Sequence, residues 1–266
     1  MKGYVVKYYR VSSEKLKNSV KRIRLIFISD FHNTFFGEKM EDLERDIQKL
    51  QADLILIGGD IVIGKPGADM EQTEKLLSIL PKNTPVYAAN GNHEYRLKIY
   101  PKVYGSMYEQ YRNLLDRYKV TLLENKSAWI TVKGTSLEIS GYELPRQYYD
   151  RFYRGDLPSW ELCGTLKKKD ENAFQILLAH HPKYFKTYLT WKPDLILSGH
   201  YHGGIIRLGG KHPVIGNDFT LFPRYGYGYF EEEGSAMIVS AGLGEHTLPL
   251  RLWNPRELVV ADIKGK

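Results

Sequence analysis

The chain has 266 residues, of which 42% are hydrophobic and 26% are charged. This length and balance are typical of a soluble globular protein with one core, and they exclude a disordered or fibrous chain, so we predict a single domain over residues 1–266. The formal net charge of +7 favours anionic partners such as phosphate-bearing substrates, nucleic acids or anionic membrane surfaces, although a well-solvated surface rich in lysine has the same charge.

The cellular setting is predicted from cysteine content and from apolar runs. The single cysteine, Cys163, has no partner for an internal disulfide, which favours a reduced compartment. The first twenty residues contain Lys, Arg and Ser and lack the apolar core and cleavage site of a secretory signal. No stretch approaches the roughly 20 apolar residues that a membrane helix needs. We therefore predict a cytoplasmic protein, with peripheral contact at a membrane left open.

The first half of the chain alternates β-rich runs with helical patterns. Strands are predicted at 22–29, 53–58 and 85–89, and helices near 38–50 and 70–80. Apolar residues of the first helix recur at spacings of three and four, which places one apolar stripe against a sheet. Such alternation is typical of βαβ units.

The second half begins with a tyrosine-rich helical pattern over about 104–118 and continues mostly with strands. Three are expected near 120–124, 128–133 and 136–141, with Gly134 and Thr135 as a hairpin turn, and four more at 174–179, 194–198, 236–240 and 257–263. The charged stretch 159–172 is read as a helix or loop. The predicted fold is α/β, with two mixed β-sheets packed as a sandwich and flanked by helices.

Asp, Asn and His residues directly follow five of these strands. They are Asp30 and His32, Asp60, Asn92 and His93, His180, and His200 and His202. In α/β sheets, ligands gather beyond the carboxyl ends of strands, so side chains that are distant in sequence can converge there. Each fragment alone is explained by a turn, a tight loop or a structural histidine. Independent turns do not explain why five of the eight histidines lie in such fragments, and the set together predicts a metal site.

The ligand types narrow the choice of metal. Carboxylate, amide oxygen and imidazole suit Mn, Fe or Zn, whereas the absence of thiolate disfavours a structural zinc site. We expect two divalent ions, with Mn the most effective in vitro. A carboxylate can bridge two ions about 3.5–4 Å apart, and Asp60 is the candidate bridge.

Five motifs, DFH, GGD, GNHE, LLAHHP and SGHYHGG, lie in this order between about residues 22 and 208. They resemble the calcineurin-like metallophosphoesterase superfamily, and the later run IVSAGLGEH…RLWNPREL is similar to its small bacterial phosphohydrolase branch. The resemblance implies the metallophosphoesterase fold. It also implies that Asp30, His32 and His202 hold one metal, that Asn92, His180 and His200 hold the other, and that Asp60 is shared.

The same resemblance implies hydrolysis of a phosphoester, for which we favour a phosphodiester. In the expected mechanism, the ions would activate water for attack on phosphorus, His93 would protonate the leaving oxygen, and Glu94 would help to orient the loop. Alternatives are a phosphomonoesterase or a pyrophosphate-bond hydrolase acting on a nucleotide or lipid-linked substrate, or a non-catalytic binder of nucleic acid or anionic membrane. No obligate protein partner is evident.

The sequence departs at two positions from the motifs of known family members, and each departure argues against one class of substrate. Asp60 is followed by Ile61 and Val62 and not by the Asp-Arg-Gly run of protein phosphatases, so the phosphate-clamping arginine of those enzymes is missing. His93 stands where lipid A precursor hydrolases typically have arginine. Both observations weigh against those two activities.

The sequence does not assign a chemical role to two further segments and three further histidines. Segments 146–154 and 222–230 are rich in Arg and Tyr, a composition that suits either phosphate binding and stacking or loop packing. His181 is read as a neighbour of the site, and His212 and His246 receive no role.

Overall fold

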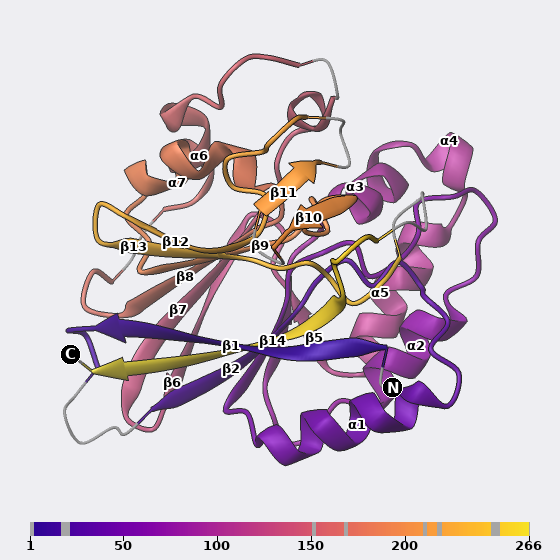
Figure 1. Cartoon of the computed structure of the whole chain (residues 1–266), viewed down its shortest axis with the longest axis horizontal. Helices are drawn as coiled ribbons and strands as arrows, with labels where there is room; N and C mark the ends of the chain where they lie inside the picture. The colour runs from indigo at the N-terminus through magenta and orange to yellow at the C-terminus, as the bar shows by residue number, and fades with distance from the viewer. Residues whose placement is uncertain are drawn as a thin grey trace.

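The computed structural model describes residues 3–16, 22–150, 153–167, 170–209, 212–216, 220–245 and 251–265. Two six-stranded sheets face each other, with helices α1, α2 and α5 outside one and α6 and α7 outside the other (Figure 1). The predicted α/β fold with two mixed sheets and flanking helices is confirmed. The single-domain organisation stays a prediction.

The first sheet has the order β1-β14-β2-β3-β4-β5. Its strands are β1 (Tyr4–Ser13), β2 (Ile23–Ile28), β3 (Leu54–Ile57), β4 (Val86–Ala88), β5 (Val120–Leu122) and β14 (Arg256–Gly265). Strands β2 to β5 are parallel, whereas β14 is parallel to β1 and antiparallel to β2. The carboxyl ends of β2, β3 and β4 therefore meet at one edge.

The second sheet has the order β12-β13-β9-β8-β7-β6. Its strands are β6 (Lys126–Val132), β7 (Thr135–Tyr142), β8 (Phe174–Ala179), β9 (Leu195–Ser198), β12 (Gly228–Glu232) and β13 (Ser235–Val239). A separate two-stranded sheet pairs β10 (Ile206–Leu208) with β11 (His212–Ile215).

The helices are short. They are α1 (Lys39–Leu50), α2 (Glu71–Ser78), α3 (Asn92–Ile99), α4 (Pro101–Tyr104), α5 (Met107–Arg117), α6 (Ser159–Thr165) and α7 (Phe185–Thr190), with 3₁₀ turns η1 (Arg146–Tyr149) and η2 (Pro182–Tyr184). Among the described residues, none of the helices has the length and apolar character needed to cross a bilayer.

The core lies in three layers, which explains why the central strands are apolar at consecutive positions. Leu25 and Phe27 of β2 pack between the two sheets, while Ile26 and Ile28 of the same strand pack under α1 and α2. A third cluster fills the space between the second sheet and α6 and α7. Both faces of β2 are buried, so its sequence shows no polar alternation.

Some predicted boundaries are wrong. The helix expected over about 104–118 is α5, which begins only at Met107, because Gly105, whose φ of 57° is left-handed, ends the separate helix α4 just before it. The β6–β7 turn uses Lys133 and Gly134, both with positive φ, so Thr135 is the first residue of β7 and not part of the turn. The Arg/Tyr-rich segment 222–230, in which no strand was predicted, enters strand β12 at Gly228.

Candidate metal centre

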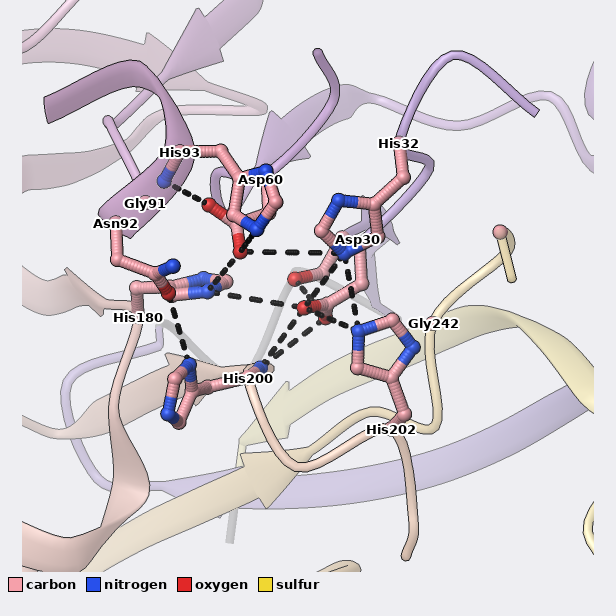
Figure 2. Close-up of polar contacts among 12 residues, drawn as sticks. Asp30, His32, Asp60, Gly91, Asn92, His93, His180, His200, His202 and Gly242 are labelled. Carbon is pink, nitrogen blue, oxygen red and sulfur yellow. Dashed lines mark hydrogen bonds and ion pairs between the residues drawn. The ribbon is translucent and has the colours of Figure 1, made fainter. Parts of the chain in front are cut away.

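All eight side chains predicted for the site lie together at the carboxyl ends of the strands. They follow β2, β3, β8 and β9 or, for Asn92 and His93, begin α3 after β4, and they point toward one another (Figure 2). The two sheets contribute to one site because the His200 N–H donates to the Asp30 carboxylate at 3.0 Å and His180 Nδ1 donates to Gly58 O at 2.7 Å.

Five of the seven predicted ligands have a left-handed backbone, an uncommon state for residues other than glycine. The φ angles are 52° for Asp30, 49° for His32, 54° for Asp60, 67° for His200 and 51° for His202. Backbone hydrogen bonds between neighbouring loops stabilise this state, for example from His32 N–H to Asp60 O at 2.9 Å. Strain of this kind is typical of functional sites.

Asp30, His32 and His202 form the first ligand group. His202 Nε2 lies 3.4 Å and His32 Nε2 lies 4.0 Å from Asp30 Oδ1, and the two Nε2 atoms are 3.0 Å apart. One potential ligand atom from each residue lies within 4.8 Å of the others, so one cation can contact all three.

Asp60, His180 and His200 form the second group, which is equally compact. His180 Nε2 lies 3.1 Å from Asp60 Oδ2. Asn92 joins the group because its Oδ1 lies 2.9 Å from His200 Nδ1. The four side chains present two oxygen and two nitrogen atoms, a set that suits Mn, Fe or Zn.

Asp60 lies between the two groups. Its Oδ1 accepts a hydrogen bond from the His93 N–H at 2.7 Å. Its Oδ2 lies 3.1 Å from His180 Nε2 and 3.9 Å from His32 Nε2. One carboxylate oxygen therefore faces both groups while the other is fixed by the backbone.

The hydrogen bonds of His180 test whether a cation fits. The ring is buried, and its Nδ1 lies 2.7 Å from Gly58 O, so Nδ1 carries the proton and Nε2 has a free lone pair. That Nε2 has no hydrogen-bond partner among the described residues, yet it faces a carboxylate oxygen. At this distance the two buried atoms need a positive charge between them, which either a proton on Nε2 or a bound cation supplies, so the residues fit a divalent ion that takes the place of that proton.

Burial and neighbouring charges shift the pKa values of Asp30, Asp60 and His180. Burial raises the pKa of Asp30 to about 6, against the effect of His180. Burial also acts to raise the pKa of Asp60, but the neighbouring histidines outweigh it and hold that pKa well below the usual range. Burial lowers the pKa of His180, but the two carboxylates overcome it and raise the value to about 10. Two buried carboxylates thus attract positive charge to the site.

Glu94 holds the loops that carry the ligands. Its buried carboxylate accepts hydrogen bonds from the backbone N–H groups of Asp60, Ile61, Val62 and Gly91, at distances of 2.8 to 3.1 Å. Burial nevertheless raises the pKa of Glu94 to about 7. The expected part of Glu94 in orienting the loop is consistent with these four contacts.

His93 stands beside the ligands with a defined orientation. The Gly64 N–H donates to its Nδ1 at 2.7 Å, so the neutral ring carries its proton on Nε2. That Nε2 lies 4.0 Å from Asp60 Oδ2, on the side of the ligand groups (Figure 2). Burial lowers the pKa of His93 to about 3, so the neutral form is favoured.

Two residues near the site were missed from sequence. The buried guanidinium of Arg251 donates from Nη2 to His202 Nδ1 at 3.1 Å and to the Gly244 carbonyl at 2.7 Å. The Asn254 amide donates to the His202 carbonyl at 2.6 Å. Both lie about fifty residues beyond His202 in the chain, and the only sequence signal was their place in the run RLWNPREL.

Three histidines, His181, His212 and His246, were not predicted to bind metal or to act in catalysis. His181 is buried, its backbone is extended, and its ring packs 4.1 Å from the His200 ring and 5.6 Å from Tyr149. His212 is exposed on β11. His246 lies outside the described residues, as do two residues of the Arg/Tyr-rich segment, Arg151 and Phe152.

A cavity of about 720 Å³ opens beside the second ligand group. His200 and Tyr149 lie on its wall together with Arg154, Lys183 and Arg224. Both Arg/Tyr-rich segments predicted from sequence therefore contribute to one cavity at the metal centre. It is large enough for an organic group attached to phosphate.

Comparison with known proteins gives the family. The family model for calcineurin-like phosphoesterases matches residues 23–204. A metallophosphoesterase of Aquifex aeolicus is 27% identical over 98% of this chain and 92% of its own length. Among solved structures, a protein of Thermus thermophilus has a TM-score of 0.51 at 15% identity, with 85% of this chain and 92% of that chain covered. The phosphopantetheinyl hydrolase of Mycobacterium tuberculosis has a TM-score of 0.50 at 15% identity, with 82% and 88% covered.

These two structures share the fold, and the matched segment contains all seven predicted ligands. The chain belongs to the calcineurin-like phosphoesterase family.

Proposed function

We propose that the chain hydrolyses a phosphodiester at a dinuclear metal centre, with His93 as the proton donor to the leaving oxygen. As a member of this family, the chain is a metal-dependent phosphoester hydrolase. The observation that carries the finer proposal is the position of Asp60 Oδ2, which faces both ligand groups. That position suits two ions that share one oxygen.

The metals assigned to the site are two divalent ions, Mn, Fe or Zn, with Mn the most effective in vitro. Asp30, His32 and His202 would hold one ion, Asn92, His180 and His200 the other, and Asp60 both. When bound, such ions lower the pKa of a water molecule and neutralise charge that develops on the phosphoryl group.

Residues of the chain orient the proton donor His93 beside the predicted metal ligands. Gly64 fixes the His93 ring so that its Nε2 proton faces the space beside Asp60. A hydrogen bond from that proton to the leaving oxygen would stabilise the negative charge on the oxygen as its bond to phosphorus breaks. That charge favours uptake of a second proton by the ring, and the resulting imidazolium can pass its Nε2 proton to the oxygen and return to the neutral form. The Asp60 contact to the His93 N–H keeps the donor and the ligand at a constant separation.

The cavity beside His200 supports a diester over a monoester. Its volume of about 720 Å³ accommodates an organic group on the phosphate, and its wall carries more cations than acids. The proposal places the chain in the cytoplasm and requires no protein partner.

The test uses the metal-reconstituted protein and a panel of aryl monoesters, aryl diesters, cyclic nucleotides and lipid-linked pyrophosphates. We expect the highest kcat/KM on diesters. A preference for monoesters or pyrophosphates would overturn the diester assignment, and no turnover with any substrate, together with tight binding of nucleic acid or vesicles, would favour a non-catalytic binder.

Two variants separate metal binding from proton donation. Asp60→Asn should lose turnover together with stoichiometric metal, because the shared ligand is weakened. His93→Ala should keep its metal and lose kcat by about 10²- to 10⁴-fold. The exposed Asp116→Asn serves as the control and should match wild type in both measurements. Full activity of a metal-free Asp60→Asn protein would disprove the mechanism.

A further inference from the structure

The small β10–β11 sheet is extended on both sides by single β-bridges. Leu252 pairs with Ile206 of β10, and Leu221 pairs with Ile215 of β11. Ile206 and Ile215 are themselves directly opposite each other. Residues directly opposite on neighbouring strands lie on the same face of a sheet, so these four side chains form one apolar row.

This row faces outward. Leu221 is 66% and Leu252 is 42% exposed, and the two isoleucines are half-buried. Leu208, two residues after Ile206 and therefore on the same face, is 52% exposed. We call Ile206, Leu208, Ile215, Leu221 and Leu252 the apolar platform.

The opposite face of the small sheet is covered. Arg207, which alternates with Ile206 and Leu208, is buried, and so is Pro213, which a β-bulge in the pairing brings opposite Arg207. The sheet thus has a defined inner face and an apolar outer face. Isolated apolar residues on a surface need no explanation, but a contiguous apolar patch indicates an interaction site.

The platform adjoins the metal centre. Arg251, which donates to His202, directly precedes Leu252. Leu221 lies on the wall of the cavity that also contains His200. A surface that docks on the platform is therefore next to the opening of the site.

Positive charge lies beside the apolar residues. Among the described residues that line the cavity, four are cationic, namely Arg154, Lys183, Lys186 and Arg224, and one is acidic, Asp150. Glu232 pairs with both Lys186 and Arg224, so this part of the wall keeps a net positive charge. The Arg224 side chain is 71% exposed.

We propose that the apolar platform is a docking surface for an anionic phospholipid bilayer, with the cavity opening at the level of the headgroups. Apolar side chains enter the boundary of the acyl chains, and the cations contact headgroup phosphates. Exposed Phe222 and Trp253, which follow Leu221 and Leu252, are residue types enriched at membrane interfaces. Nucleic acid would match the cations but leave the apolar row in water.

The proposal is tested by cosedimentation of the full chain with vesicles, without measurement of turnover. We expect binding to vesicles of phosphatidylcholine with phosphatidylglycerol at low salt, weaker binding at high salt, and little binding to phosphatidylcholine alone. Because hydrolysis is not measured, the result is independent of the proposed reaction.

Leu208→Glu and Leu252→Glu should each weaken vesicle binding by roughly tenfold or more, because each removes apolar burial and adds a negative charge. The control is Trp129→Glu on β6, which has the same charge change at a residue that is 40% exposed and should bind as wild type does. Thermal unfolding checks that the variants are folded.

Three results would overturn the proposal. The first is no binding to phosphatidylglycerol vesicles at low salt. The second is equal loss of binding in the platform variants and in Trp129→Glu, which would indicate a general charge effect. The third is binding to duplex DNA that exceeds vesicle binding and is unchanged by the platform variants.

Discussion

At the scale of single residues, glycines determine how close the carboxylates come to the loops. A Cβ on Gly91 would lie 2.2 Å from Asp60 Oδ1, and a Cβ on Gly199 would lie 2.1 Å from Asp30 Oδ2. Both positions have space for hydrogen only. The placement of the two acidic ligands therefore depends on neighbours that carry no side chain.

Gly91→Ala should displace Asp60 and lower both metal affinity and kcat by about 10- to 100-fold. Metal stoichiometry after dialysis and steady-state kinetics measure these effects. Gly164→Ala on α6 is the matched control, because no atom lies within 4 Å of the added Cβ; it should leave activity unchanged and raise stability by up to about 1 kcal/mol. Equal activity of the two variants would contradict the steric argument.

The candidate ligands could be found from sequence because each directly follows an apolar strand. The order of apolar run, glycine and polar residue is local, as at Gly59 and Asp60. The contacts that Arg251 and Asn254 make to His202 are not local, and no spacing rule connects residues about fifty positions apart. The structure brings the predicted ligands together, and their roles stay predictions.

At the scale of elements, pairing between distant strands is fixed by specific side chains. Arg24 on β2 lies opposite Asp262 on β14, and its guanidinium donates twice to that carboxylate, at 2.7 and 2.9 Å. The two side chains are each only 14% exposed. A bidentate pair of this kind fixes register as well as contributing energy.

The hydrogen bonds from Arg24 hold the pKa of Asp262 below its usual range. A lowered folded-state pKa means that the pair stabilises the fold above the unfolded pKa of about 3.9, and that this contribution is lost as the pH falls through the folded value. Asp262→Asn should therefore cost about 1.5 kcal/mol at pH 7 and much less near pH 2.

Urea unfolding at both pH values measures the difference between wild type and Asp262→Asn. Asp42→Asn, which removes the partner of Arg45 in a more exposed pair, is the control and should cost about 0.5 kcal/mol or less. A cost for Asp262→Asn that does not change with pH would contradict the linkage.

The buried parallel strands were predictable because their apolar runs are continuous. Strand β1 was missed since it is an edge strand in which most side chains are half-buried or exposed, and its pairing partner β14 lies at the other end of the sequence. Strands β10 and β11 were missed because they are short and pair outside the main sheets. Local patterns carry little information about such pairing.

At the scale of the whole molecule, β14 joins the two ends of the described chain. Its ten residues pair in parallel with β1 from Tyr4 to Ser13, and its other edge pairs with β2. Leu258 and Val260 pack under the helices, while Val259 and Ala261 pack between the sheets. One strand therefore contributes to two of the three core layers.

Deleting residues 256–265 should abolish cooperative thermal unfolding and cause aggregation, because both β1 and β2 would expose unpaired edges. Calorimetry and light scattering measure the two effects. Lys264→Ala, at an exposed position of the same strand, should unfold within about 0.5 kcal/mol of wild type. A truncated chain that still unfolds cooperatively would show that the sandwich is complete without β14.

The position of β14 also has a consequence for protein synthesis. A ribosome makes β1 before the other described strands, so the strand that belongs between β1 and β2 is the last of the described strands to emerge. Until then β1 has no neighbour in its sheet, and the loops that follow β2, β3 and β4 extend from an incomplete first sheet. Metal capture by Asp30 and His32 is therefore expected only after β14 has been made and has paired with β1 and β2, since these strands complete the sheet from which the Asp30 loop extends.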